Sequence, residues 1–312
     1  MARMLHEATA AGLSGAASGT RPGGKAAAGV ETRSWAFEAG AEIAPGRRVL
    51  ALLGGGTRYE AYLVWDDSLF APVVAKLLRP HLIRDARALG GLNREARALA
   101  ELRHPALVRS FDSILEGDHP HLVLEFLDGP RLSTLVRRHG PLSAEQLVSL
   151  ARQLCSALQY MAGAGWLHLD VKPRNIVVTA SPMLIDLSVA RTLDDARAIS
   201  TAVGTDAYMA PEQCDPARYG EIEPRTDVWG LAATLYEALT GRLAFPKTGA
   251  DERFPQLHAS LPAMPPKAPR VLATALVAAL DPRPADRPTA GELYDALEPL
   301  ADWSHRLARR LP

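Results

Sequence analysis

The chain has 312 residues with 35 basic and 35 acidic side chains, which gives a formal net charge of zero. This balance does not favour nucleic acid or an acidic membrane as a partner. The length fits one large two-lobed domain or two ordinary domains. Only two cysteines, Cys155 and Cys214, are present, so a disulfide framework and a zinc site are disfavoured, and both are expected to be structural thiols in a reducing cytoplasm.

The two ends of the chain differ in composition from the rest. Residues 1–34 are rich in Ala and Gly and contain no apolar run long enough for a signal peptide or a membrane span, so we expect a disordered leader and a cytoplasmic protein without a transmembrane segment. Residues 306–312 are expected to form a short basic tail. The folded domain is expected at 35–305.

The first part of that domain has the pattern of a sheet followed by a helix. Short β-prone runs at 49–53 and 61–65, broken by Gly and Pro, predict a small antiparallel sheet. Leu92, Leu99 and Leu102 then recur at helical spacing, with Glu95 and Ala96 between them, which predicts one helix against the sheet.

The second part is mainly helical. A strand at 121–126 runs into Asp128-Gly129-Pro130, which has the composition of a linker. We expect an α+β fold with a small sheet lobe at about 35–126, a larger helical lobe at about 129–305, and a ligand site between them. The helices are predicted from capping pairs and buried stripes at Ser143 and Gln146 with Leu147, Leu150, Leu154 and Leu158; at Val228, Leu231, Leu235 and Leu239; and at Thr289 and Glu292 with Leu293, Leu297 and Leu300.

One loop places three chemically useful side chains close together. Residues 168–175 read H-L-D-V-K-P-R-N, which puts a carboxylate (Asp170), a cation (Lys172) and an amide (Asn175) within a few positions. A short strand later, Asp186 stands alone between apolar neighbours, and carboxylates of this kind bind Mg²⁺. Taken singly, each of these residues is also an ordinary turn or cap residue.

In this order and spacing, the residues resemble a known family. H-L-D-V-K-P-R-N resembles the catalytic loop of eukaryotic-type (Hanks-type) bacterial serine/threonine protein kinases, and D-L-S resembles their D-F-G metal motif. The resemblance implies that Asp170 accepts or orients the proton of a substrate hydroxyl and that Lys172 neutralises charge near the γ-phosphate of ATP. It also implies that Asn175 and Asp186 hold Mg²⁺, with Mn²⁺ able to substitute.

A glycine-rich run upstream resembles the loop that covers the phosphates of ATP in this family. Residues 53–62 read L-G-G-G-T-R-Y-E-A-Y, and the resemblance implies that Leu53, Gly54, Gly56 and Ala61 contact the nucleotide. Tyr59 occupies the position of the third glycine. This bulky residue is expected to stiffen the loop or to cover the triphosphate differently.

The next motif supplies the ion pair of the small lobe. Residues 73–76, V-V-A-K, resemble the family's V-A-I-K strand, which implies that Ala75 lines the nucleotide site and that Lys76 holds the α- and β-phosphates. Glu95, on the helix that follows, is implied as the ion-pair partner of Lys76. A solvated lysine and a solvated glutamate are the alternative when each is considered alone.

The strand at 121–126 resembles the one that enters the hinge between the lobes. The resemblance implies that backbone groups of Glu125 and Leu127 bond the adenine edge, with Leu124 as the gatekeeper side chain. A buried strand with an acidic end fits the same residues.

Residues 204–213, G-T-D-A-Y-M-A-P-E-Q, resemble the end of an activation segment. The resemblance implies a pair between Glu212 and Arg287, hydrogen bonds from the catalytic-loop backbone to Asp227, and contact of Thr205 with the catalytic aspartate and lysine when a peptide is bound.

Three departures from the family pattern support a rival hypothesis. Tyr59, Leu169 in place of an arginine that clamps phosphorylated activation loops, and Ser188 in place of glycine are compatible with a nucleotide-binding pseudokinase scaffold. A small-molecule phosphotransferase with the same fold is a third reading. Because Leu169 cannot clamp a phosphate, we predict that phosphorylation of Thr192, Ser200 or Thr201 brings no large gain in activity.

The retained charged residues favour an active enzyme over the scaffold. We expect a kinase that transfers the γ-phosphoryl group of ATP to Ser or Thr of protein substrates, from a bacterium whose Ala-, Arg-, Gly- and Pro-rich composition indicates a GC-rich genome. Its substrates, activating signal and oligomeric state do not follow from the sequence.

Overall fold

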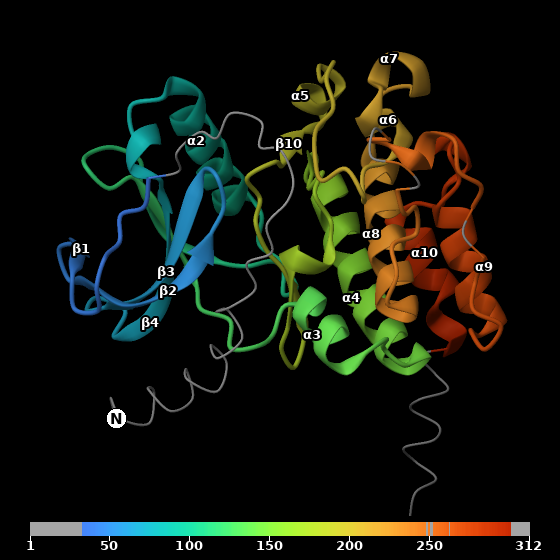
Figure 1. The fold of residues 1–312 in the computed structure, drawn as a ribbon, viewed down its shortest axis with the longest axis horizontal. Coiled ribbons are helices and arrows are strands. Elements are labelled where there is room, and N and C mark those ends of the chain that lie inside the picture. Colours follow the sequence, from blue (N-terminus) through green and yellow to red (C-terminus); the bar gives the residue numbers. More distant parts are fainter. Residues whose placement is uncertain (1–32, 248, 250–251, 262, 301–312) are drawn as a thin grey trace, which may run out of the picture. The chain divides into compact units, whose positions relative to one another are not determined.

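The computed structural model describes residues 33–247, 249, 252–261 and 263–300. The leader expected at 1–34 therefore lies almost wholly outside the described residues, and the tail expected at 306–312 lies entirely outside them. Within them, the expected α+β fold with a sheet lobe and a helical lobe is confirmed (Figure 1). None of the described helices is both long enough and apolar enough to cross a lipid bilayer.

The small lobe is a six-stranded antiparallel sheet in the order β1-β2-β3-β4-β6-β5. Side chains alternate between its faces. Tyr62, Ala75 and Val123 lie on one face in an outer cluster with Trp35, whereas Leu124 faces the main core on the other side. The strands are β1 (Glu42–Ala44), β2 (Arg47–Gly55), β3 (Tyr59–Asp66), β4 (Ala71–Leu78), β5 (Ser110–Ile114) and β6 (His121–Glu125).

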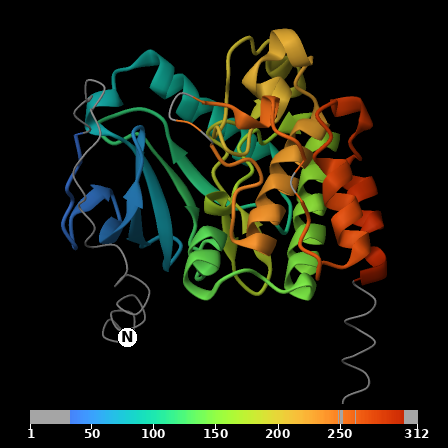
Figure 2. The ribbon, with the colours of Figure 1, turned by 45° about the vertical axis from the view of Figure 1, so that its right-hand side comes forward.

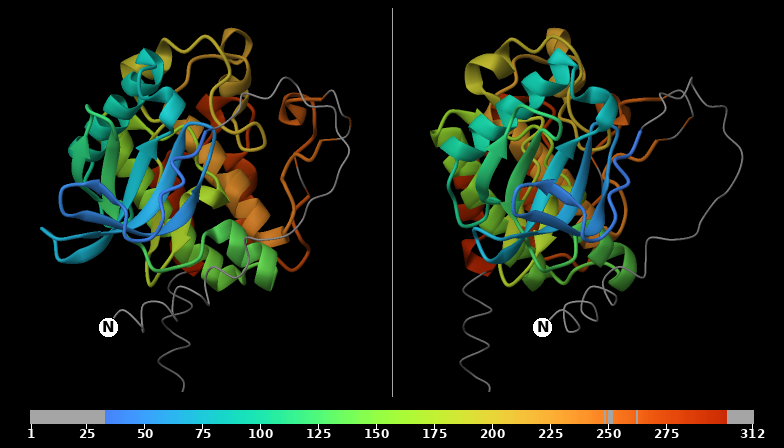
Figure 3. Two further views of the ribbon diagram at one scale, coloured as in Figure 1. Left: turned by 60° about the vertical axis from the view of Figure 1, so that its left-hand side comes forward. Right: turned by 90° about the vertical axis from the view of Figure 1, so that its left-hand side faces the viewer.

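Helix α2 (Ala86–Glu101) packs against β4, β5 and β6, and Figures 2 and 3 show it beside the sheet from further directions. The Asp85 side chain caps its first turn by accepting a bond from the Ala88 amide at 2.7 Å. Its buried stripe carries Leu92 and Leu99 as predicted, and also Glu95, which is only 1% exposed. A carboxylate buried on the core face of a helix needs a cationic partner.

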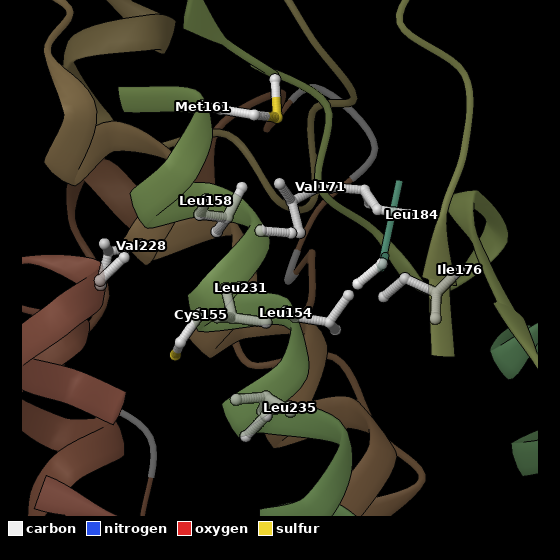
Figure 4. Close-up of a cluster of buried hydrophobic side chains, with 14 of the residues drawn as sticks. Leu154, Cys155, Leu158, Met161, Val171, Ile176, Leu184, Val228, Leu231 and Leu235 are labelled. Carbon is white, nitrogen blue, oxygen red and sulfur yellow. The ribbon is translucent and has the colours of Figure 1, made fainter. Parts of the chain in front are cut away.

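The large lobe is built around α4 (Ala144–Gly163), which packs against α8 (Pro224–Thr240) and α10 (Ala290–Ala296). Figure 4 shows Leu154 and Leu158 of α4 meeting Leu231 of α8 in the buried core. The predicted capping box of Ser143 and Gln146 is confirmed. The remaining helical elements are η1 (Pro80–Leu82), α3 (Leu132–His139), η2 (Pro173–Asn175), α5 (Leu193–Arg197), α6 (Pro211–Cys214), α7 (Pro216–Tyr219), η3 (Pro255–Leu257), α9 (Arg270–Ala279) and η4 (Pro284–Asp286).

The last predicted helix is shorter than expected. Its capping box of Thr289 and Glu292 is confirmed, but α10 ends at Ala296 and Leu297 forms a turn before residues 298–300 become helical again. The spacing of apolar residues continues across this turn, so periodicity alone did not reveal the break.

Two short antiparallel strand pairs position the loops between the lobes. β8 (Ile176–Val178) pairs with β9 (Pro182–Leu184), which places the residues before β8 beside those after β9. β7 (Trp166–Leu167) pairs with β10 (Arg191–Thr192), which fixes the start of the activation segment next to the catalytic loop.

Both cysteines are free and buried. Burial raises the pKa of each thiol, Cys155 and Cys214, to about 12, so neither is a thiolate at neutral pH. This agrees with the expectation of structural thiols.

Candidate active site

A buried carboxylate fixes the catalytic loop. Asp227, in the first turn of α8, accepts hydrogen bonds from the backbone amides of His168 and Leu169, both at 2.7 Å. The predicted bonding of Asp227 to this loop is therefore confirmed. Asp227 is 4% exposed, so water cannot replace either amide. Loss of one of these bonds would leave a buried acceptor unsatisfied, at a large cost in free energy.

The loop contains a strained residue that its neighbours hold in place. Leu169 has a φ of +62°, a left-handed conformation unfavourable for a bulky side chain. Its carbonyl accepts a bond from the Gln213 side-chain amide at 2.9 Å. Gly204 lies so close that a Cβ there would sit 2.8 Å from the same carbonyl oxygen, so only glycine fits at that position.

Three polar side chains form a closed network at the catalytic position. Lys172 Nζ donates to Asp170 Oδ2 and to Thr205 Oγ1, both at 2.6 Å, and the Thr205 hydroxyl donates to Asp170 Oδ1 at 2.7 Å. Thr205 was expected to make this contact when a peptide is bound. These hydrogen bonds join the segment that carries Thr205 directly to the catalytic loop.

A backbone hydrogen bond places the segment that carries Asn175 beside the one that carries Asp186. Asn175 Nδ2 donates to the carbonyl of Asp170 at 3.0 Å and to its Oδ2 at 3.1 Å, which leaves the amide oxygen of Asn175 as the free group. The backbone amide of Ile185 donates to the backbone carbonyl of Asn175 at 2.8 Å. Asp186 is the next residue in the chain, so its backbone lies close to that of Asn175.

This donor set fits Mg²⁺. Mg²⁺ is usually held by one or two protein oxygens together with water and substrate phosphates, not by a full protein cage. The side chains of Asn175 and Asp186 supply two oxygens of this kind.

The buried Glu95 finds its partner in Lys76. Lys76 Nζ donates to the two Glu95 carboxylate oxygens at 2.7 and 2.9 Å and to Asp186 Oδ1 at 2.7 Å. The predicted ion pair is confirmed, and Asp186 joins it from the other lobe.

The charges in this cluster stabilise one another. Burial alone lowers the pKa of a lysine, but the carboxylates of Asp186 and Glu95 outweigh it and raise the pKa of Lys76 above its usual value. Burial works against ionisation of Asp186, yet the Lys76 ammonium holds the pKa of Asp186 well below its usual range. Lys76 is therefore a cation and Asp186 an anion at neutral pH.

The glycine-rich run forms the turn between β2 and β3. Gly54 lies opposite Ala61, and Ala61 lies opposite Lys76, so Ala61 shares a sheet face with the lysine. Leu53 sits in the irregularity of register between Leu52 and Gly54. Gly56 donates from its amide to the Tyr59 carbonyl at 2.9 Å, which closes the turn.

The structure does not bring Ala75 to this site. Ala75 pairs with Tyr62 and Val123 and is buried with them in the outer cluster, on the face opposite to Lys76. Adjacent residues of a strand point to opposite faces, so the residue that shares the lysine's face is Val74. In V-V-A-K the small residue stands one position later than in V-A-I-K, and this offset explains the incorrect assignment.

The hinge residues lie where the resemblance implied. Leu124 is buried opposite Val74, and Glu125 ends β6 with its carboxylate 2.7 Å from Arg109 Nη2. Leu127 follows in the connection to α3, and within the described residues its amide has no hydrogen-bond partner from the protein. Adenine binding by Glu125 and Leu127 remains a prediction.

Comparison with known proteins agrees with this geometry. A model of the protein kinase domain matches residues 47–296. The chain belongs to the protein kinase family. Serine/threonine-protein kinase PknB of Mycobacterium leprae is 34% identical over 203 residues, which is 62% of this chain and 32% of PknB. Serine/threonine-protein kinase PknL of Mycobacterium tuberculosis is 33% identical over 251 residues, 77% of this chain and 61% of PknL. The chain thus spans about a third of the length of PknB.

The activation segment of this kinase domain is anchored by a fully buried ion pair. Arg287 donates to the two Glu212 oxygens at 2.6 and 2.8 Å, and neither side chain is exposed, as the sequence predicted. A second anchor was not predicted. Asp206 pairs with Arg253, and Gln256 Nε2 donates to the Asp206 carbonyl at 2.7 Å.

The position of the missing clamp arginine is filled by an apolar cluster. Leu169 is 2% exposed and is buried with Leu167, Ala196 and Ile222. Four half-buried side chains of the activation segment pack against them: Val189, Leu193, Ile199 and Val203. The sequence indicated that a phosphate clamp is absent but did not predict this cluster, because its apolar residues are spread over 167–222 without a recognisable spacing.

We predict that Arg287→Met destabilises the protein by about 3–5 kcal/mol, because it leaves Glu212 buried without its partner. Urea unfolding of the full chain measures the change. Arg283→Met is the matched control, since Arg283 is 79% exposed and its surface ion pairs contribute less than about 1 kcal/mol. Equal stabilities of the two variants would contradict this role.

We predict that removing the candidate phosphorylation sites leaves activity within about threefold of wild type, because apolar contacts already dock the segment. The variant combines Ser200→Ala and Thr201→Ala with Thr192→Asn. Asparagine is chosen because the Thr192 side chain caps α5 by accepting the Asp195 amide, and Asn preserves a cap. Initial rates of phosphate transfer are measured for both proteins. A drop of about a hundredfold would show that a phosphate is required.

Proposed function

We propose that the chain is an ATP-dependent serine/threonine protein kinase. The network that joins Asp170, Lys172 and Thr205 carries this proposal, because it holds a carboxylate ready to accept a hydroxyl proton beside a cation. The relatives named above are called serine/threonine-protein kinases, but the chain spans only part of them, so their names support the proposal without extending it to a whole protein.

The residues divide the reaction between positioning and charge stabilisation, the two effects on which phosphoryl transfer depends. Lys76 holds the α- and β-phosphates, and Glu95 fixes Lys76 in place. Asp170 orients the substrate hydroxyl, takes up its proton as the oxygen bonds the γ-phosphorus, and the bond from that phosphorus to the bridging oxygen of ADP breaks. Lys172 offsets the negative charge that develops beside Asp170.

Asn175 and Asp186 would hold Mg²⁺, with Mn²⁺ able to replace it. When bound, the metal supplies positive charge to the phosphate oxygens. Asn175 contributes its free amide oxygen because its nitrogen is occupied by Asp170. Asp186 is ionised at neutral pH because Lys76 stands beside it, so it is ready to bind a cation.

A protein substrate is favoured over a small molecule. Two sets of contacts fix residues 204–213: the ion pair of Glu212 with Arg287, and the hydrogen bonds from Gln256 to the carbonyls of Asp206 and Met209. The segment therefore forms a fixed surface next to Asp170. Lys172, two residues after Asp170, resembles the lysine of serine/threonine kinases, which supports Ser and Thr acceptors over Tyr. The reduced, buried Cys155 and Cys214 support a cytoplasmic site of action in a bacterium.

The scaffold alternative is weakened by what two of its three residues, Leu169 and Ser188, do. Leu169 packs in an apolar cluster and leaves Asp170 in its network, and the Ser188 amide lies 3.4 Å from Asp186 Oδ1 without displacing that carboxylate from Lys76. Each of the six charged or amide side chains expected in the active site forms a hydrogen bond with at least one of the other five; these are Lys76, Glu95, Asp170, Lys172, Asn175 and Asp186.

We predict that Asp170→Asn and Lys76→Met each lower transfer of labelled γ-phosphate from Mg·ATP to a generic basic protein by roughly a hundredfold to ten-thousandfold. The reason is that one variant lacks the proton acceptor and the other lacks the phosphate-binding cation. Phosphoamino-acid analysis of the product is expected to show phosphoserine and phosphothreonine.

Matched controls are Asp118→Asn and Lys267→Met, which change exposed residues and should retain wild-type rates. ATP binding without transfer in the wild type would favour the scaffold. Transfer to a small molecule but to no protein would favour the phosphotransferase.

A further inference from the structure

Tyr59 takes a place in the site that the sequence did not reveal. It is the first residue of β3, and the centroid of its ring lies 4.6 Å from Lys76 Nζ, with the ammonium over the ring. The side chain is half-buried and packs against the main core. The residue at the third-glycine position therefore turns inward onto the ion pair.

The register of the sheet explains this direction. Ala61 lies opposite Lys76 and on its face, and Tyr59 precedes Ala61 by two residues, so it shares that face. The backbone that closes the glycine-rich turn is thereby connected directly to the lysine through a side chain.

The same ring reaches helix α2. A Cβ added at Gly91 would lie 3.6 Å from the Tyr59 hydroxyl, an ordinary contact distance, whereas a Cβ at Gly90 would meet nothing within 4 Å. Glycine inside a helix lowers helix stability relative to alanine. The contact with Tyr59 gives a physical reason for glycine at 91, since any side chain larger than alanine would meet the tyrosine.

The type of contact matters because of how the lysine is bonded. Lys76 has three N–H groups, and Glu95 and Asp186 accept from them at 2.7 to 2.9 Å. An aromatic face attracts a cation through its quadrupole and takes no hydrogen bond from it. Tyr59 can thus hold the ammonium in place while an N–H is exchanged from Asp186 to a phosphate oxygen.

We infer that Tyr59 is a positioning residue for phosphate binding, which holds Lys76 between the glycine-rich turn and α2 through its ring face. This inference rests on the proposed function, in which Lys76 binds the phosphates of ATP. Burial raises the pKa of Tyr59 to about 12, and Glu95 adds to the effect, so the ring is neutral at working pH.

The first test compares Tyr59→Phe, which keeps the ring face, with Tyr59→Leu, which keeps apolar bulk only. Affinities of the full chain for Mg·ATP and for adenosine are measured by titration calorimetry, together with kcat and KM for ATP. We expect the Leu variant to bind Mg·ATP roughly twofold to thirtyfold more weakly, with kcat/KM reduced alike, and the Phe variant to match wild type.

Adenosine separates positioning from general damage. It lacks phosphates and does not contact Lys76, so its affinity should be unchanged in both variants. Equal losses for adenosine and Mg·ATP, or equal behaviour of Phe and Leu, would overturn the inference.

A second test perturbs Tyr59 without changing it. Gly91→Leu places a side chain where the tyrosine hydroxyl lies, and Gly90→Leu is the matched control, with the same gain in helix propensity and open space around it. We expect weaker Mg·ATP binding only for Gly91→Leu, and no further loss when it is combined with Tyr59→Leu. Additive losses in the double variant would contradict a shared cause.

The outcomes for the inference and for the proposed function are distinct. If the wild type transfers phosphate but Tyr59→Leu binds Mg·ATP normally, the inference fails and the function stands. If the wild type transfers none but Tyr59→Leu selectively loses Mg·ATP affinity, the function fails and the role of Tyr59 in phosphate binding stands.

Discussion

The catalytic site depends on two backbone hydrogen bonds to one buried carboxylate. Asp227 receives the amides of His168 and Leu169, and the left-handed turn at Leu169 that follows directs Asp170 toward Lys172 and Thr205. Strain of this kind persists only where surrounding contacts over-determine it. The contacts here come from α8 and from the activation segment, so the loop, the helix and the segment form one mutually dependent unit.

Buried charge connects the two lobes in a similar way. Lys76 comes from the small sheet and Asp186 from the segment after β9, and Lys76, 12% exposed, is stabilised as a cation by the carboxylates of Asp186 and Glu95. Such a cluster contributes less net stability than its short distances suggest, because removing the ions from water is costly. The cluster instead favours this arrangement of the sheet, α2 and the segment after β9, since few other arrangements would pair all three charges.

The sequence predicted contacts that depend on residue identity in a fixed motif. The pairs Lys76 with Glu95 and Glu212 with Arg287 were named in advance because both partners stand in recognisable runs. Ala75 was assigned to the nucleotide site because it was matched to the alanine of V-A-I-K by residue type, whereas its position next to Lys76 places it on the opposite face of the strand. The helix break at Leu297 leaves the apolar spacing intact, and Asp206 and Arg253 are far apart in the sequence, so short-range patterns encode neither feature.

The two bulkiest departures from the family pattern, Tyr59 and Leu169, both add contacts within the chain. Tyr59 stands where the family motif has glycine, and Leu169 stands where it has arginine. Tyr59 contacts Lys76, and Leu169 packs against the activation segment. In both places the contact is made between side chains of the chain itself. Apolar contacts are also insensitive to salt, unlike a clamp between an arginine and a phosphate. Residues that suggest impairment when each is compared with a motif therefore support, in three dimensions, the lysine and the segment that the proposed reaction uses.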